Sequence, residues 1–202
     1  LKRGTFSPVL LKSERLYWLA ANVSVSGVST RVIQSHVSVS ILGYPSDGDF
    51  SGGPRQRSVT STYSSSLPSP FPTGATTAAG AMRLIFVEVS TATPITQRLP
   101  TVSPSRDASL LSFRKRTVTH VPGFTQNATT GALTADNVYA VPFYVSKDIV
   151  VDALSIDVTT SSTGRVTLAI YQDDGNTYPG TLVSETLVTS LNSNTTGLKR
   201  GT

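Results

Sequence analysis

Two pairs of aspartates stand out as residues whose type and spacing could do chemistry. They are Asp47 with Asp49 and Asp173 with Asp174, and each pair lies beside glycine. Two facing carboxylates can hydrolyse a glycosidic bond, and clustered aspartate oxygens can hold calcium. Aspartate beside glycine is also favoured in tight turns, where its side chain hydrogen-bonds the nearby backbone. We prefer the turn interpretation for both pairs and keep calcium on one of the two loops as the alternative.

Aromatic side chains near expected loops form a second candidate group: Tyr44, Tyr63, Tyr171 and Tyr178. Sugar-binding modules stack pyranose rings on such faces, while nearby polar side chains bind the hydroxyls. The alternative is that Tyr171 closes a strand and Tyr178 packs beneath its own hairpin, and we favour this structural interpretation. The candidate ligand-binding residues are Tyr44, Asp47, Asp49, Tyr171, Asp173, Asp174 and Tyr178.

The densest charged cluster is the basic trio Arg114, Lys115 and Arg116. On a strand, Arg114 and Arg116 would share one face and Lys115 would take the other. Such a cluster can contact phosphate or an acidic subunit surface, so these three residues are the candidates for subunit contact. The commoner role of such a cluster is a solvated edge strand that repels mispairing.

Familiar catalytic motifs are absent from the sequence, including GxSxG, HExxH, the Walker phosphate loop and GxGxxG. The chain has two histidines, His36 and His120, and no cysteine, so neither a zinc site nor a disulfide framework is expected. We therefore predict a protein that is not an enzyme and that uses no metal or cofactor.

The composition limits the partners. The formal net charge is +5, but only 14% of the residues are charged. A basic chain can favour nucleic acid, an anionic glycan or an acidic neighbouring subunit, and charge this dilute argues against nucleic acid. No apolar run approaches the length that spans a membrane, so membrane insertion is not expected.

Apolar residues alternate with Ser and Thr over much of the chain, whereas helical periodicity is almost missing. Short strands separated by turn signals at this spacing predict an all-β fold, an antiparallel β-sandwich of jelly-roll type. Loops that could contact a binding partner are expected at Gly43–Pro54, Leu67–Ala81 and Asp173–Pro179. The clearest expected strands are Arg15–Gly27, Thr30–Leu42, Met82–Ser90, Asn137–Ser146, Asp148–Ser162, Gly164–Asp174 and Gly180–Ser190.

The C-terminal third carries a longer pattern, "LTADNVYAVPFYVSKDIVVDALSIDVTTSSTGRVTLAIYQDDGNTYPGTLV". It resembles the front half of β-sandwich modules in bacteriophage virion proteins, chiefly tail-fibre, spike and adhesion components. The hairpin IYQDDGNTYPG is the most specific part of the likeness. Residues Phe6–Ser90, with "YWLA" and "MRLIFVEV", resemble the back half of the same kind of module.

The two halves stand in reverse order along this chain. The resemblance therefore implies a back half at residues 1–90, a Pro/Ser/Thr-rich linker or arm with a strand at 91–131, and a front half at 132–202. The pentapeptide LKRGT occurs at residues 1–5 and again at 198–202. It marks one register of a tandem array, a permuted module whose ends meet, or a half-sandwich donated to a neighbouring chain.

The resemblance implies a non-enzymatic structural component of a phage virion, in the tail, a fibre or the surface. It would act in assembly and host attachment. The partners expected are other virion proteins, further copies of the chain, such as a trimer, and a host-surface glycan. Two alternatives stay open: a carbohydrate-binding module of a secreted glycan-active protein, and a jelly-roll capsid or decoration protein.

Overall fold

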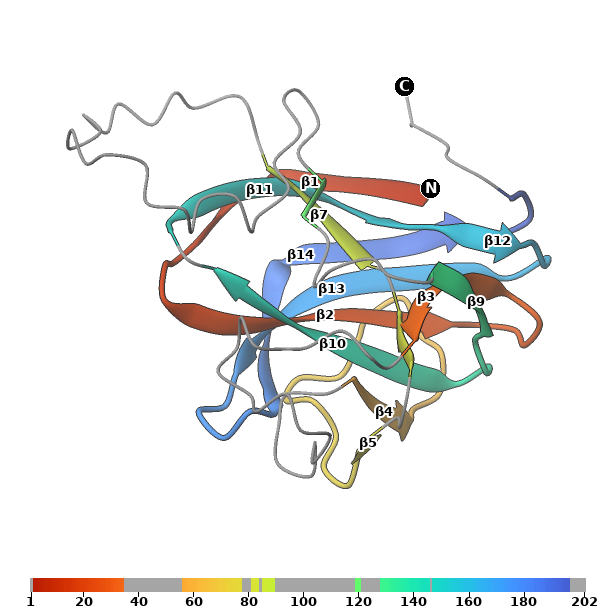
Figure 1. The fold of residues 1–202 in the computed structure, drawn as a ribbon, viewed down its shortest axis with the longest axis horizontal. Helices are drawn as coiled ribbons and strands as arrows, with labels where there is room; N and C mark the ends of the chain where they lie inside the picture. Colours follow the sequence, from red (N-terminus) through yellow and green to blue (C-terminus); the bar gives the residue numbers. More distant parts are fainter. Residues whose placement is uncertain are drawn as a thin grey trace.

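The computed structural model describes residues 2–34, 56–77, 81–83, 85–89, 119–120, 128–145 and 147–196. Within these ranges every regular element is a β-strand, and every strand pair is antiparallel, so the predicted all-β antiparallel sandwich is confirmed (Figure 1). The strands are β1 (Lys2–Leu11), β2 (Arg15–Val23), β3 (Ser29–Gln34), β4 (Arg57–Thr60), β5 (Thr76–Thr77), β6 (Ala81–Arg83), β7 (Ile85–Val89), β8 (Thr119–His120), β9 (Ala128–Ala132), β10 (Asn137–Val145), β11 (Ile149–Ile156), β12 (Val158–Thr160), β13 (Arg165–Asp173) and β14 (Pro179–Asn192).

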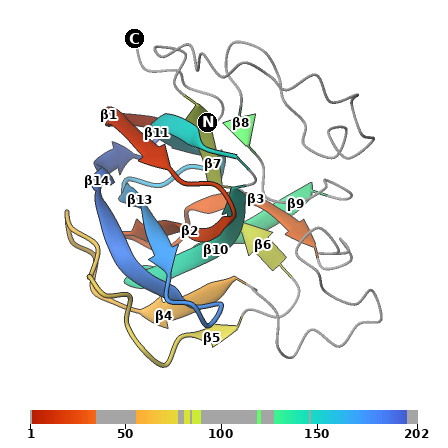
Figure 2. The ribbon, with the colours of Figure 1, turned by 90° about the vertical axis from the view of Figure 1, so that its left-hand side faces the viewer.

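These strands form three sheets. Sheet A has the order β1-β11-β7-β8, and sheet B has the order β14-β13-β2-β10-β4-β5. Sheet C has the order β12-β3-β6, with β9 also paired to β3. Figure 2 shows sheet A above sheet B, with β14 next to β1 on one side and β4 and β5 at the opposite edge of sheet B.

Strand β2 lies between two strands from the other end of the chain. Leu19 is paired with Val141 of β10 on one side and with Ile170 of β13 on the other. In sheet A, β11 is likewise flanked by β1 and β7. Strands of the N-terminal and C-terminal segments, which the sequence analysis expects to be reversed half-modules, are therefore interleaved within common sheets of one chain.

Both faces of β2 are buried. Tyr17 and Leu19 point into the main core between sheets A and B, together with residues such as Leu154 of β11. Trp18 and Ala20 point to the other side of sheet B, where they join a second apolar cluster. The near-continuous apolar run RLYWLAANV follows from this burial, because a strand covered on both faces cannot alternate apolar and polar residues.

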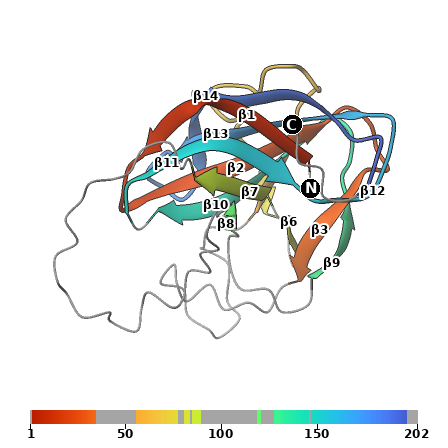
Figure 3. The same cartoon turned by 90° about the horizontal axis from the view of Figure 1, so that it is seen from above.

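Strand β1 lies against β14, and together they close one side of the sandwich (Figure 3). Gly4 of β1 packs directly on Val188 of β14, where an added Cβ would lie 1.8 Å from Cγ1 of Val188. The neighbouring Arg3 donates from Nε to Oε2 of Glu88 at 2.7 Å, and Oγ of Ser155 donates to the other carboxylate oxygen at 2.9 Å. Side chains from β1, β7 and β11 are therefore joined at this side of the sandwich.

The structure refines several expected strands. The segment Asp148–Ser162 divides at Asp157 into β11 of sheet A and β12 of sheet C, so one expected strand serves two sheets. The sequence patterns missed β1. They also missed β9, which pairs with β3 and lies at the end of the segment 91–131, predicted as a linker or arm with a strand, and at the first residue of the predicted front half. Both strands lack a regular apolar alternation. The loop expected at Gly43–Pro54 lies outside the described residues.

Gly4→Ala is expected to lower the free energy of unfolding by about 1–3 kcal/mol, because the added methyl overpacks the contact with Val188. Chemical denaturation measures this change. Val188→Ala removes the clashing methyl groups, so the double variant should lose less stability than the sum of the two single variants. Strictly additive losses would contradict the contact.

Candidate functional site

Four of the candidate ligand-binding residues lie at the end of β13 and in the turn that follows it: Tyr171, Asp173, Asp174 and Tyr178. The structure brings these four residues together in one hairpin between β13 and β14 (Figure 1). The other candidates lie outside the described residues: Tyr44, Asp47, Asp49, Arg114, Lys115 and Arg116.

Tyr171 is fully buried. Its hydroxyl donates to the carbonyl of Pro68 at 2.6 Å, and its ring meets Phe71 edge to face, with the ring centroids 5.3 Å apart. Burial raises the pKa of this phenol well above its usual range. No face of the ring is open, so Tyr171 cannot stack against a sugar in this structure.

Tyr178 is half-buried, and its hydroxyl also holds the proline-rich loop. The hydroxyl donates to the carbonyl of Pro72 at 2.7 Å and accepts from the backbone N–H of Ala75 at 3.0 Å. The guanidinium of Arg57 lies 5.3 Å from the ring centroid, a cation–π distance. We call Tyr171 and Tyr178, with the carbonyls of Pro68 and Pro72, the tyrosine clamp.

The clamp changes the interpretation of the loop predicted at Leu67–Ala81. Leu67 and Phe71 are buried in the second apolar cluster, and the N–H of Phe71 donates to the carbonyl of Gly180 in β14. The described part of this loop therefore covers the outer face of sheet B. It is irregular in backbone but fixed at several points.

The two hairpin aspartates bind their own turn. Asp173 accepts from Nε1 of Trp18 at 2.8 Å through Oδ1 and from the N–H of Gly175 at 2.9 Å through Oδ2. Asp174 accepts from the N–H of Asn176 at 2.8 Å. Gly175 has a φ of 94°, which glycine tolerates best. Both carboxylates therefore stabilise the hairpin, and that of Asp173 also ties it to β2.

A small open hollow of about 210 Å³ lies beside this hairpin. It is lined by Arg15, Leu16, Tyr17, Gln172, Asp173 and Gly175. Its volume is below the several hundred Å³ of typical small-molecule sites. Arginine and glutamine side chains carry hydrogen-bonding groups that suit sugar hydroxyls. Sequence patterns missed the hollow because β2 and β13 lie far apart in the chain.

Sequence patterns also missed Trp18, Pro68 and Pro72 as partners of the candidate residues. One signal was available: a buried Trp or Tyr needs a partner for its N–H or O–H, and the proline-rich segment offers free carbonyls. Nothing in the sequence indicates which carbonyl each hydroxyl meets, because that depends on how the loop crosses sheet B.

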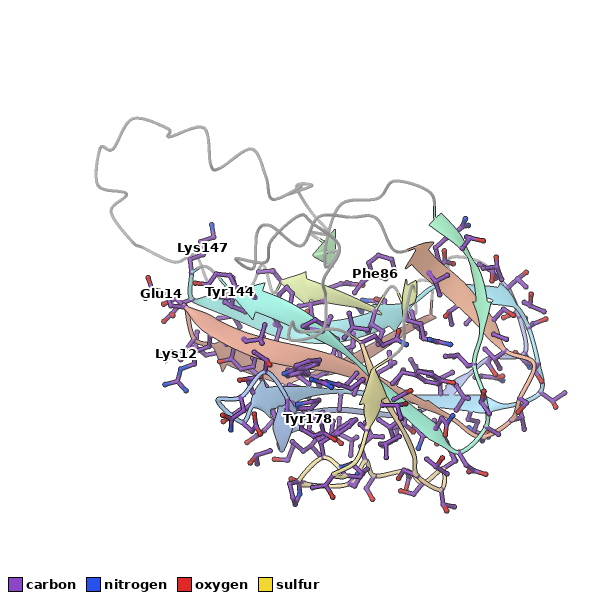
Figure 4. The ribbon with its side chains drawn as sticks, turned by 60° about the horizontal axis from the view of Figure 1, so that its bottom comes forward. Lys12, Glu14, Phe86, Tyr144, Lys147 and Tyr178 are labelled. Carbon is purple, nitrogen blue, oxygen red and sulfur yellow. The ribbon has the colours of Figure 1, made fainter. Side chains whose placement is uncertain are left out.

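Tyr171→Phe and Tyr178→Phe should each lower the free energy of unfolding by about 1 kcal/mol, because each leaves a loop carbonyl without its hydroxyl donor. Each variant should also increase protease cleavage between residues 64 and 75. Tyr144→Phe is the control, since Tyr144 is 41% exposed and lies apart from Tyr178 (Figure 4). Wild-type stability and cleavage in both clamp variants would contradict the clamp.

The buried phenol of Tyr171 also predicts a pH dependence. An unfolded tyrosine ionises near pH 10, whereas burial raises the pKa in the folded state. The unfolded state therefore releases its proton first, and stability should fall as the pH rises above about 10. Tyr171→Phe should flatten this fall in denaturation midpoints measured between pH 9 and 11. An unchanged slope in the variant would show that Tyr171 titrates normally.

Among the residues that the structure describes, no group of three or more His, Cys, Asp or Glu side chains could hold a metal ion. The same residues include no helix that is long and apolar enough to cross a membrane. In comparisons with known proteins, no family model, no curated protein and no solved structure matches this chain.

Proposed function

We propose that this chain is a non-enzymatic structural component of a bacteriophage virion, in the tail, a fibre or the surface. It acts by assembly with other virion proteins and further copies of itself. It also takes part in attachment to the host surface.

The observation that carries this proposal is the meeting of the two segments that resemble phage modules. The "YWLA" segment lies in β2, and the "IYQDDGNTYPG" segment covers the end of β13 and its hairpin. These strands are neighbours in sheet B, and Trp18 of one is hydrogen-bonded to Asp173 of the other. The two parts of the resemblance therefore meet in one sandwich, as parts of a single module would.

The chemistry of the hairpin favours the same interpretation. Its two aspartates hold the turn, and its two tyrosines hold the loop that covers sheet B. Hydrogen bonds to the fold thus engage the polar groups that a glycosidase or a stacking sugar site would need free. These contacts support a structural role over catalysis.

For host attachment, the hollow beside the hairpin is a better place for a glycan than the tyrosine rings. Arg15 and Gln172 line it and can bind sugar hydroxyls or a sugar carboxylate. The same hollow is the observation that favours the second candidate function, a carbohydrate-binding module of a secreted protein. The two functions are separated by whether the chain is found on a phage particle or in a secreted protein.

Immunogold electron microscopy of native phage particles tests the proposal, with an antibody raised against this chain. We expect label at a fixed, symmetric position on the particle. Particles without label would contradict the virion role. If the antibody instead detects the chain only in a secreted enzyme, and Arg15→Ala abolishes its glycan binding, the result would support the carbohydrate-binding module. Tyr144→Ala is the matched control for glycan binding, because Tyr144 does not line the hollow.

A further inference from the structure

The pentapeptide LKRGT occurs at residues 1–5 and again at residues 198–202. Four residues of the first copy, Lys2–Thr5, form the start of β1 and pair with Ile156–Ala153 of β11. The site that the first copy occupies is therefore known residue by residue. We call this edge of β11, together with Glu88 and Val188, the β1 site.

The β1 site selects two side chains of the pentapeptide. Arg3 lies 2.7 Å from the carboxylate of Glu88, which is 5% exposed and also accepts from Ser155. The next position must be glycine, because any Cβ at Gly4 would overlap Val188. Arginine followed by glycine is thus the part of the sequence that the site recognises.

The dipeptide Arg-Gly occurs only twice in the chain, at Arg3 with Gly4 and at Arg200 with Gly201. The second occurrence carries the same flanking residues as the first. Strand pairing uses backbone groups, and the two selective contacts use Arg and Gly, so the β1 site can accept either copy equally well.

Strand β1 also consists of two parts that pair separately with β11. Its register against β11 shifts between Thr5 and Val9, and Val9–Leu11 then pair separately with Val151–Ile149. Lys2–Thr5 can therefore leave the β1 site while Val9–Leu11 remain paired. Replacement of the first copy of the pentapeptide by a second copy therefore does not require the sandwich to unfold.

We propose that residues 199–202 of one copy replace Lys2–Thr5 of a second copy in its β1 site and so join the chains head to tail. This inference rests on the proposed assembly role and names the contact that performs it. The contact is heterologous, so it builds a ring if the rotation closes and a filament if it does not. The tethered first copy competes for the site, so the exchange needs a high protein concentration or neighbours held close together.

Analytical ultracentrifugation of the full chain tests the exchange. We expect dimers and longer species that increase with protein concentration, up to about 1 mM, the effective concentration that a short tether supplies. Gly201→Val should weaken this association at least about tenfold, since a β-branched side chain cannot sit on Val188. The substitution leaves Gly4, and hence the chain's own β1 pairing, unchanged.

Gly197→Val is the matched control, because it places the same side chain just before the pentapeptide and should associate as the wild type does. Arg200→Glu should weaken association as Gly201→Val does, since it brings a carboxylate to Glu88. A wild-type chain that stays monomeric over the whole range would overturn the inference. Association that Gly201→Val and Arg200→Glu leave unchanged would overturn it as well.

The absence of cysteine from the chain allows a direct test of the register. Thr5 is the strand partner of Ala153, so Thr202 of a neighbouring copy should take that place. The variant with Thr202→Cys and Ala153→Cys should form disulfide-linked dimers and longer chains on mild oxidation. Cross-links within single chains only, or none, would overturn the exchange between copies.

These experiments use the purified chain, so their outcome is independent of where the chain sits on a particle. Particle labelling without self-association would retain the virion role and remove this contact. Self-association without particle labelling would retain the contact and remove the virion role.

Discussion

The rest of the structure depends on the position of β2 between β10 and β13. Without β2, sheet B would separate into β13–β14 and β10–β4–β5, because no other described strand joins the two parts. The main core would lose Leu19 and Tyr17, and the second cluster would lose Trp18. Since β2 comes from the N-terminal segment and its neighbours come from the C-terminal segment, neither segment can complete the sandwich alone.

The polar contacts beside β2 extend this constraint to the surface. The indole of Trp18 donates to Asp173, which also holds the turn of the hairpin, and the hairpin tyrosines hold the proline-rich loop. The residues that first suggest chemistry in the sequence are therefore used to build the fold. This is why we propose an assembly role for the protein and propose the hollow next to Arg15 as the place of glycan contact.

Much of the sandwich could be predicted from the sequence, because β10, β13 and β14 have clear patterns bounded by turn residues. The strands β1 and β9 could not, since Gly4 and Pro8 interrupt the first and the second contains only Ala, Thr and Gly. The division at Asp157 also depends on tertiary structure, because the chain passes there from sheet A to sheet C. Local patterns do not encode which sheet a strand joins.

For the candidate site, the sequence indicated the turn role of the aspartates but gave no sign of Trp18 as a partner of Asp173. That bond exists only because β2 and β13 pair in one register, with Trp18 opposite Tyr171. The burial of Tyr171 likewise depends on the loop that crosses sheet B, since an uncovered sheet would leave its ring exposed. Sequence patterns therefore identify the hairpin but not what its side chains contact.

A disulfide between β2 and β13 tests the central claim most directly, because Ala20 of β2 is the strand partner of Ala169 and the chain contains no cysteine. The variant with Ala20→Cys and Ala169→Cys should form a cross-link within single chains, seen as a monomer of altered mobility on a non-reducing gel. Ala20→Cys with Ala153→Cys, which joins different sheets, should form none. Absence of the first cross-link, or its appearance only between chains, would contradict the placement of β2 within its own chain.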